Sequence, residues 1–146
     1  MRSDERRRCA EMTPEGATLL LVDDNEMLRK VLRRLMRTLG ISRIDEAPDG
    51  VAALELFQKT AYDLVLTDWN MPRMNGLELV ERIRHGEVRS DTPVVLFTGE
   101  ASSRNLLDAL KAGATDYIGK PFVAGIVCQK VLRILNLLPR ENPTPV

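Results

Sequence analysis

Five polar side chains in this sequence end or directly follow short apolar runs, and their types suit metal and phosphoryl chemistry. They are three carboxylates, one hydroxyl and one ammonium: Asp23, Asp24, Asp68, Thr98 and Lys120. Carboxylates held close together repel one another, and a hard cation such as Mg²⁺, which prefers oxygen ligands, relieves that repulsion. An aspartate can also act as a covalent nucleophile and form an acyl phosphate. The set therefore predicts a Mg²⁺ site beside a carboxylate that can accept a phosphoryl group.

The hydroxyl and the ammonium have roles in the same reaction. Phosphoryl transfer needs neutralisation of charge on the transferred oxygens, which Lys120 and Thr98 can supply together with the metal. No His or Cys lies near these positions, which argues against zinc or copper, and the lone His85 is interpreted as a surface residue. Taken singly, an Asp at a strand end is often only a helix cap and a Lys there is usually solvated. All five together at successive strand ends favour a functional site.

The elements that must position these residues alternate along the chain. Apolar runs that are short enough for buried strands lie at 18–22, 41–47, 63–67, 93–98 and 116–119, and the 41–47 run is weak enough for an edge strand. Helical periodicity lies between and after them, at 28–39, 51–60, 77–85, 106–112 and 123–138. Five such units predict an α/β fold with a doubly wound parallel sheet and right-handed crossovers. Ligands of such sheets bind beyond the carboxyl ends of the strands, where the five residues fall.

Polar residues at the predicted helix starts supply caps. The candidates are Asp24 or Asn25, Asn75, and Ser102 or Ser103, whereas Asp49-Gly50 is interpreted as a turn into the second helix. Val123 stands where the last helix needs a cap, so we expect that helix to begin without one.

Composition limits the class of protein. The chain has 146 residues, with 21 acidic and 21 basic side chains, so its net charge does not favour nucleic acid or membrane. Two unpaired cysteines, Cys9 and Cys128, and the lack of a long apolar segment lead us to expect a cytoplasmic protein. Residues 1–16 and 139–146 are expected to be a disordered extension and a flexible tail around one domain at 17–138.

Four motifs carry a resemblance to a known family. They are LVDDNE at 21–26, LTDWNMPRMNGLEL at 66–79, LFTGEA at 96–101 and GKPF at 119–122. With these motifs the chain resembles the receiver domains of two-component response regulators, above all the stand-alone chemotaxis receivers, over about 120 residues from Thr18 to Leu138. The resemblance implies a (βα)5 flavodoxin-like sheet with strand order 2-1-3-4-5.

The resemblance also implies roles for individual residues. Asp68 is similar to the phosphorylated aspartate, and Thr98 and Lys120 match residues that contact the phosphoryl group. The implied Mg²⁺ ligands are Asp23, Asp24, Asp68 and the backbone carbonyl of Asn70. Tyr117 matches a switch aromatic that turns inward on activation, Asn70 and Glu100 match positions that tune phosphoryl lifetime, and the Lys120–Pro121 peptide is expected to be cis.

Three functions are compatible with these residues. The first is a stand-alone switch that is phosphorylated by a histidine kinase or a histidine phosphotransfer protein, with chemotaxis as one candidate pathway. The second is a phosphate shuttle or sink in a phosphorelay. The third is an aspartyl phosphatase, which needs an Asp two residues after the nucleophile, where this chain has Asn70. We therefore expect no turnover of external substrates.

The expected output is protein contact, because no DNA-binding or catalytic domain follows Leu138. The resemblance places the target on the face of the fourth helix, fifth strand and fifth helix, in a monomer or weak dimer. The first helix carries a basic face, interpreted as solvated or, next best, as a docking surface: Arg29, Lys30, Arg33, Arg34 and Arg37. No aromatic residues interleave with these side chains, so nucleic-acid binding is not expected.

Overall fold

The computed structural model describes residues 13–99 and 102–137. Its elements, in chain order, are η2 (Pro14–Gly16), β1 (Thr18–Val22), α2 (Glu26–Thr38), β2 (Arg43–Ala47), α3 (Gly50–Lys59), β3 (Leu64–Asp68), α4 (Gly76–His85), β4 (Val94–Thr98), α5 (Ser103–Ala112), β5 (Asp116–Gly119) and α6 (Ala124–Ile134). The predicted alternation of strands and helices is confirmed. Asp68 and Thr98 are the last residues of their strands, whereas Asp23 follows β1 directly.

All five strands are parallel and form one sheet in the order β2-β1-β3-β4-β5, as the resemblance implied. The three central strands β1, β3 and β4 are almost fully buried, because their apolar runs face helices on both sides. The register pairs Asp68 with Phe97 and Thr98 with Gly119, so the last residues of β3, β4 and β5 lie at the same edge of the sheet. The predicted edge strand is β2, which mixes exposed and buried residues.

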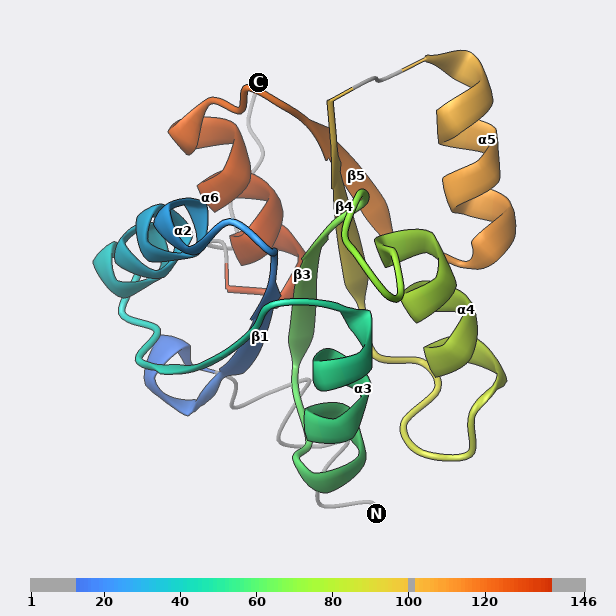
Figure 1. Ribbon diagram of the computed structural model, residues 1–146. Coiled ribbons are helices and arrows are strands. Elements are labelled where there is room, and N and C mark those ends of the chain that lie inside the picture. Colours follow the sequence, from blue (N-terminus) through green and yellow to red (C-terminus); the bar gives the residue numbers. More distant parts are fainter. Residues whose placement is uncertain (1–12, 100–101, 138–146) are drawn as a thin grey trace, which may run out of the picture.

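Helices cover both faces of the sheet (Figure 1). On one face α2 and α6 pack against Leu19, Leu21 and Phe97, and on the other α3, α4 and α5 pack against side chains that include Leu20, Val65 and Leu96. Alternate residues of one strand thus enter opposite cores, which is the geometry expected of a doubly wound sheet.

The helix caps resolve the choices that the sequence left open. Asn25 rather than Asp24 caps α2, and Ser102 rather than Ser103 caps α5. Asn75 forms a reciprocal capping box with Glu78 at the start of α4. Val123 offers no side-chain cap to α6, as predicted. Asp24 is therefore not the cap of α2.

Residues 13–16 of the predicted extension are described in the structure. Thr13 caps the short helix η2, and Pro14 lies against the end of α2 at Gly40. The disorder of the extension stays a prediction. Residues 1–12 and the predicted tail at 139–146 lie outside the described residues. Within the described part, none of the helices is long and apolar enough to cross a membrane.

Candidate functional site

The loop after β1 places two aspartates at the carboxyl edge of the sheet. Asp23 is 3% exposed, and its Oδ1 accepts a hydrogen bond of 2.9 Å from the backbone N–H of Asn25. Asp24 points to solvent. Arg29 supports the turn from α2, because one of its N–H groups donates to the carbonyl of Asp23 at 2.5 Å. The Asp23 carboxylate is thus held inside the site, whereas the Asp24 carboxylate lies at its solvent-exposed edge.

Asp68 completes an acidic cluster from the neighbouring strand β3. One carboxylate oxygen from each of Asp23, Asp24 and Asp68 can be chosen so that all three lie within 4.8 Å of one another. Oδ1 of Asp68 accepts the N–H of Trp69 at 2.9 Å, whereas its Oδ2 accepts no hydrogen bond from the described residues. The sequence prediction that these three carboxylates converge is confirmed.

Lys120 supplies the cation of the site. Its Nζ lies 2.9 Å from Oδ1 of Asp68 and 3.5 Å from Oδ2 of Asp23. The Lys120–Pro121 peptide is cis, as predicted, and the Lys120 backbone N–H donates to the carbonyl of Thr98 at 2.7 Å. One ammonium among three carboxylates leaves the cluster negative, and hard oxygen ligands without His or Cys suit Mg²⁺. The side chains present therefore fit the implied metal.

Electrostatics at Asp23 reflect this excess of negative charge. Burial raises the pKa of Asp23, and the charges of Asp68 and Asp24 add to that effect. The Asn25 N–H and Lys120 oppose it without cancelling it. In the metal-free protein the ionised Asp23 carboxylate therefore works against folding.

Asp23→Asn is expected to stabilise the metal-free protein at pH 7 and to raise its melting temperature by a few degrees. The amide keeps the Oδ1 acceptor for Asn25 and removes the charge. Because the folded-state pKa is raised, the penalty is present above that pKa and is relieved as pH falls through it, so the difference between variant and wild type should shrink on acidification. Thermal melts in chelator at several pH values measure this difference. A lower melting temperature for the variant at pH 7 would contradict the expectation.

Thr98 and Tyr117 lie on the same face of the sheet. Thr98 is buried at the end of β4. The register pairs Leu96 with Tyr117 and Thr98 with Gly119, so Tyr117 is the diagonal neighbour of Thr98 on β5. The Tyr117 ring is half-buried against the α3–α5 side of the sheet, and Lys130 Nζ lies 5.8 Å from its centroid. This adjacency would let movement at one residue reach the other.

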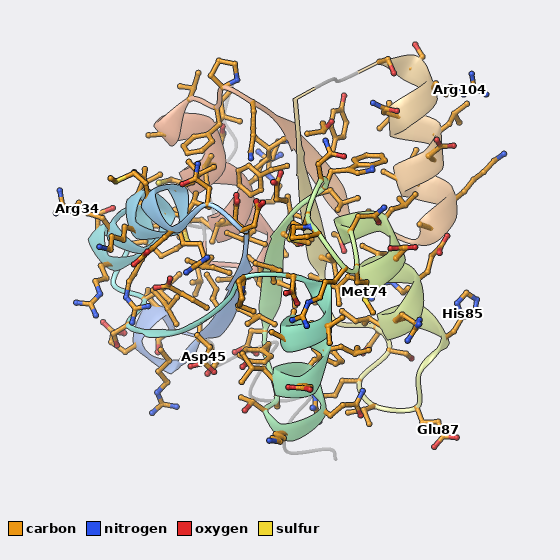
Figure 2. The ribbon with its side chains drawn as sticks, in the orientation of Figure 1. Arg34, Asp45, Met74, His85, Glu87 and Arg104 are labelled. Carbon is orange, nitrogen blue, oxygen red and sulfur yellow. The ribbon has the colours of Figure 1, made fainter. Side chains whose placement is uncertain are left out.

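Three further residues from the sequence analysis are Asn70, Glu100 and His85. Asn70 is exposed in the loop between β3 and α4, beside Trp69. Its predicted roles stay predictions. Glu100 lies outside the described residues, so its predicted role is likewise not tested. His85 projects from the outer side of α4, away from the strand ends (Figure 2), and its Nδ1 lies 2.9 Å from the carbonyl of Glu81.

Three arginines form ion pairs that the sequence analysis did not predict. Arg29 was interpreted as part of a solvated basic face, but its Nε contacts Glu46 at 2.9 Å and its side chain is only 15% exposed. Arg33 contacts the same carboxylate at 2.6 Å. Their i, i+4 spacing beside the apolar stripe was the available signal. Arg73, which pairs with Asp49 at 2.7 Å, gave no such signal because 24 residues separate the partners.

Comparison with known proteins agrees with this geometry. The model of the response regulator receiver domain family matches residues 19–132. The chain is 39% identical over 120 residues to the chemotaxis protein CheY-3 of Vibrio cholerae, covering 82% of this chain and 92% of that protein. The match extends along most of both chains.

Solved structures show the same fold. The chemotaxis response regulator CheY4 of Vibrio cholerae superposes with a TM-score of 0.76 at 30% identity, covering 81% of this chain and 98% of that one. The receiver domain of a sensor histidine kinase from Pseudomonas aeruginosa, with a magnesium ion coordinated in its active site cleft, gives a TM-score of 0.75 at 29% identity and covers 83% and 98%. The chain therefore belongs to the family of response regulator receiver domains.

Proposed function

We propose that this chain is a stand-alone phosphoacceptor switch, in which Asp68 receives a phosphoryl group from a histidine kinase or a histidine phosphotransfer protein in the presence of Mg²⁺. The observation that carries the proposal is the position of Lys120, whose Nζ lies 2.9 Å from Oδ1 of Asp68, a member of the acidic cluster. The magnesium ion in the cleft of the related Pseudomonas receiver supports the choice of metal.

The chemistry of the proposed step follows from which atoms are held. Lys120 and the Trp69 N–H hold Oδ1 of Asp68, so Oδ2 is the oxygen available to attack phosphorus. Its lone pair forms the new O–P bond as the P–N bond of the donor phosphohistidine breaks, and the departing imidazole keeps that electron pair and takes up a proton. Lys120 and the Thr98 hydroxyl then stabilise the phosphoryl oxygens. Bound Mg²⁺, held by Asp23, Asp24, Asp68 and the carbonyl of Asn70, would neutralise charge on the same group.

The proposed output surface is the face of α5, β5 and α6. A phosphoryl group that draws the Thr98 hydroxyl toward it would free space for the neighbouring Tyr117 ring to turn inward. A groove of about 350 Å³ lies beside Tyr117, lined also by Val123, Ile126 and Lys130. Val123 and Ile126 are exposed apolar side chains, and exposed apolar surface of this kind suits a partner peptide. Phosphorylation would shift the equilibrium between existing conformations of this face rather than create a new conformation.

A phosphate shuttle or sink remains the second candidate, because it uses the same site. The chemotaxis relatives favour the switch. In either case we propose a phosphoacceptor, not a turnover enzyme for external substrates. The two differ in whether the phosphorylated form captures a target. Affinity capture with and without beryllofluoride, a phosphoryl mimic, separates them, because only the switch gains a partner in the mimic-bound state.

Wild-type protein is expected to gain one phosphoryl group from a small phosphodonor, and only when Mg²⁺ is present. Few fixed ligands leave the ion largely hydrated, so we expect weak binding of the metal alone. Trp69 directly follows Asp68, so its fluorescence should report the titration. Intact-mass measurement after incubation with Mg²⁺ or chelator checks the transfer. Undiminished transfer in chelator, together with Trp69 emission that does not change when Mg²⁺ is added, would overturn the metal requirement.

A further inference from the structure

The loop between β3 and α4, residues 69–75, carries the Asn70 carbonyl that the proposed function places at the metal. Its ends are fixed by backbone hydrogen bonds: the Trp69 N–H donates to the carbonyl of Phe97 at 3.0 Å, and the Gly76 N–H donates to the carbonyl of Trp69 at 2.8 Å. These bonds anchor the loop to the sheet and to the start of α4. They leave its outer part, around Arg73, to be held by other contacts.

Arg73 holds the outer part of the loop from an unusual backbone conformation. Its φ of 68° lies in the left-handed region, which is unfavourable for side chains other than Gly, Asn or Asp. The guanidinium donates two hydrogen bonds to Oδ2 of Asp49, from Nε at 2.9 Å and from Nη2 at 2.7 Å. Two charge-assisted bonds to one carboxylate are strong enough to compensate for that conformation.

Asp49 is a rigid anchor for this contact. It is 5% exposed and caps α3, where its Oδ1 accepts the N–H of Ala52 at 2.9 Å. Its two oxygens thus have separate tasks, one for the helix and one for Arg73. Both the Ala52 bond and the Arg73 guanidinium contribute to lowering the pKa of Asp49, so its carboxylate stays charged at neutral pH.

The backbone next to Arg73 also connects the loop to the start of α3. The Gly50 N–H donates to the carbonyl of Met74 at 3.1 Å, and a Cβ on Gly50 would lie only 2.7 Å from that oxygen. Figure 2 shows Met74 between the amino-terminal end of α3 and the helix α4. Residues 73 and 74 are therefore docked together on the start of α3, one by its side chain and one by its carbonyl.

We propose that Arg73 is a positioning residue for the metal and phosphoryl site. By pairing with Asp49 it fixes the loop so that the Asn70 carbonyl faces the acidic cluster, an inference that rests on the proposed function of that cluster. The guanidinium acts through the backbone, because among the described residues its hydrogen bonds go to Asp49 alone. Loss of the pair should therefore loosen the loop even when no metal is bound.

The test compares Arg73→Asn with the wild type. Asn tolerates the left-handed conformation, so the variant removes the guanidinium without adding backbone strain. We expect faster hydrogen exchange of the amides between Asn70 and Met74 in the metal-free protein. We also expect Mg²⁺ affinity, measured by Trp69 fluorescence, to fall about tenfold, as is usual when the support of a metal ligand is removed.

Two further variants separate positioning from a general loss of stability. Asp49→Asn keeps an oxygen for Ala52 but loses the charge, so it should reproduce the Arg73→Asn effect, and the double variant should add little to either. Tyr62→Phe removes a side-chain hydrogen bond of similar length, 2.6 Å from the Tyr62 hydroxyl to Asp45 on β2, away from this loop. It should leave both loop exchange and Mg²⁺ affinity unchanged.

The outcomes distinguish this inference from the proposed function. If wild-type protein binds Mg²⁺ and Arg73→Asn binds it equally well with unchanged loop exchange, the positioning role is overturned and the proposed function stands. If Tyr62→Phe weakens Mg²⁺ binding as much as Arg73→Asn, the effect is one of general stability and the role is again overturned. If wild-type protein shows neither Mg²⁺ binding nor phosphoryl uptake, the proposed function fails and this inference fails with it.

Discussion

Asp68→Asn is expected to reduce phosphoryl uptake from a small phosphodonor by about a thousandfold or more, because removal of a covalent nucleophile is seldom compensated. Asn has nearly the same shape, and its carbonyl oxygen can still accept the hydrogen bonds that Lys120 and the Trp69 N–H now make to Oδ1. The fold and the Lys120 position should therefore survive. What is lost is the anionic oxygen that attacks phosphorus.

Intact-mass spectrometry over a time course measures this loss, with melting curves to show that the variant is folded. The matched control is Asp45→Asn, the same chemical change on β2, where the carboxylate accepts the Tyr62 hydroxyl at 2.6 Å. The control should be phosphorylated at the wild-type rate. Uptake by Asp68→Asn at that rate would mean that another group is the nucleophile.

The central strands could be predicted because their physics is local. The runs at 18–22, 63–67 and 93–98 are too apolar and too short for anything but strands buried on both faces, and they became β1, β3 and β4. Parallel strands then bring Asp23, Asp68 and Thr98 to one edge without any knowledge of their order. The order β2-β1-β3-β4-β5 came from the resemblance, since alternation of elements alone does not fix it.

Contacts between segments that are distant along the chain could not be predicted from the sequence. No sequence pattern near Arg73 indicates Asp49 as its partner, because the pair forms only when the β3–α4 loop lies against the start of α3. The interpretation of Arg29 as a solvated residue was wrong for a related reason. A residue at the border of an apolar helix stripe is buried or exposed depending on the partner that the neighbouring strand supplies, and here that partner is Glu46. The choice of Asn25 over Asp24 as the α2 cap was undecidable from residue types, because both cap equally well.

Gly76 lies where the start of α4 packs directly against the backbone of Asp68. It is the first residue of α4, and a Cβ added there would lie 2.2 Å from the carbonyl oxygen of Asp68 and 2.7 Å from Cδ2 of Leu96. Leu96 is fully buried, and the carbonyl belongs to the last residue of β3, so neither neighbour can move aside cheaply. The close approach of α4 to β3 therefore requires glycine.

Gly76→Ala is expected to destabilise the protein by roughly 3 kcal/mol and to lower its melting temperature by about 10 °C, even though alanine favours helices over glycine. Gly99→Ala is the matched control, because a Cβ there meets none of the described atoms within 4 Å. It should melt within about 2 °C of the wild type. Since the clash falls on the backbone of Asp68, Gly76→Ala should also slow phosphoryl uptake at temperatures where it is folded. Equal melting temperatures for the two variants would show that α4 can move away from β3, and would remove the reason for glycine at this position.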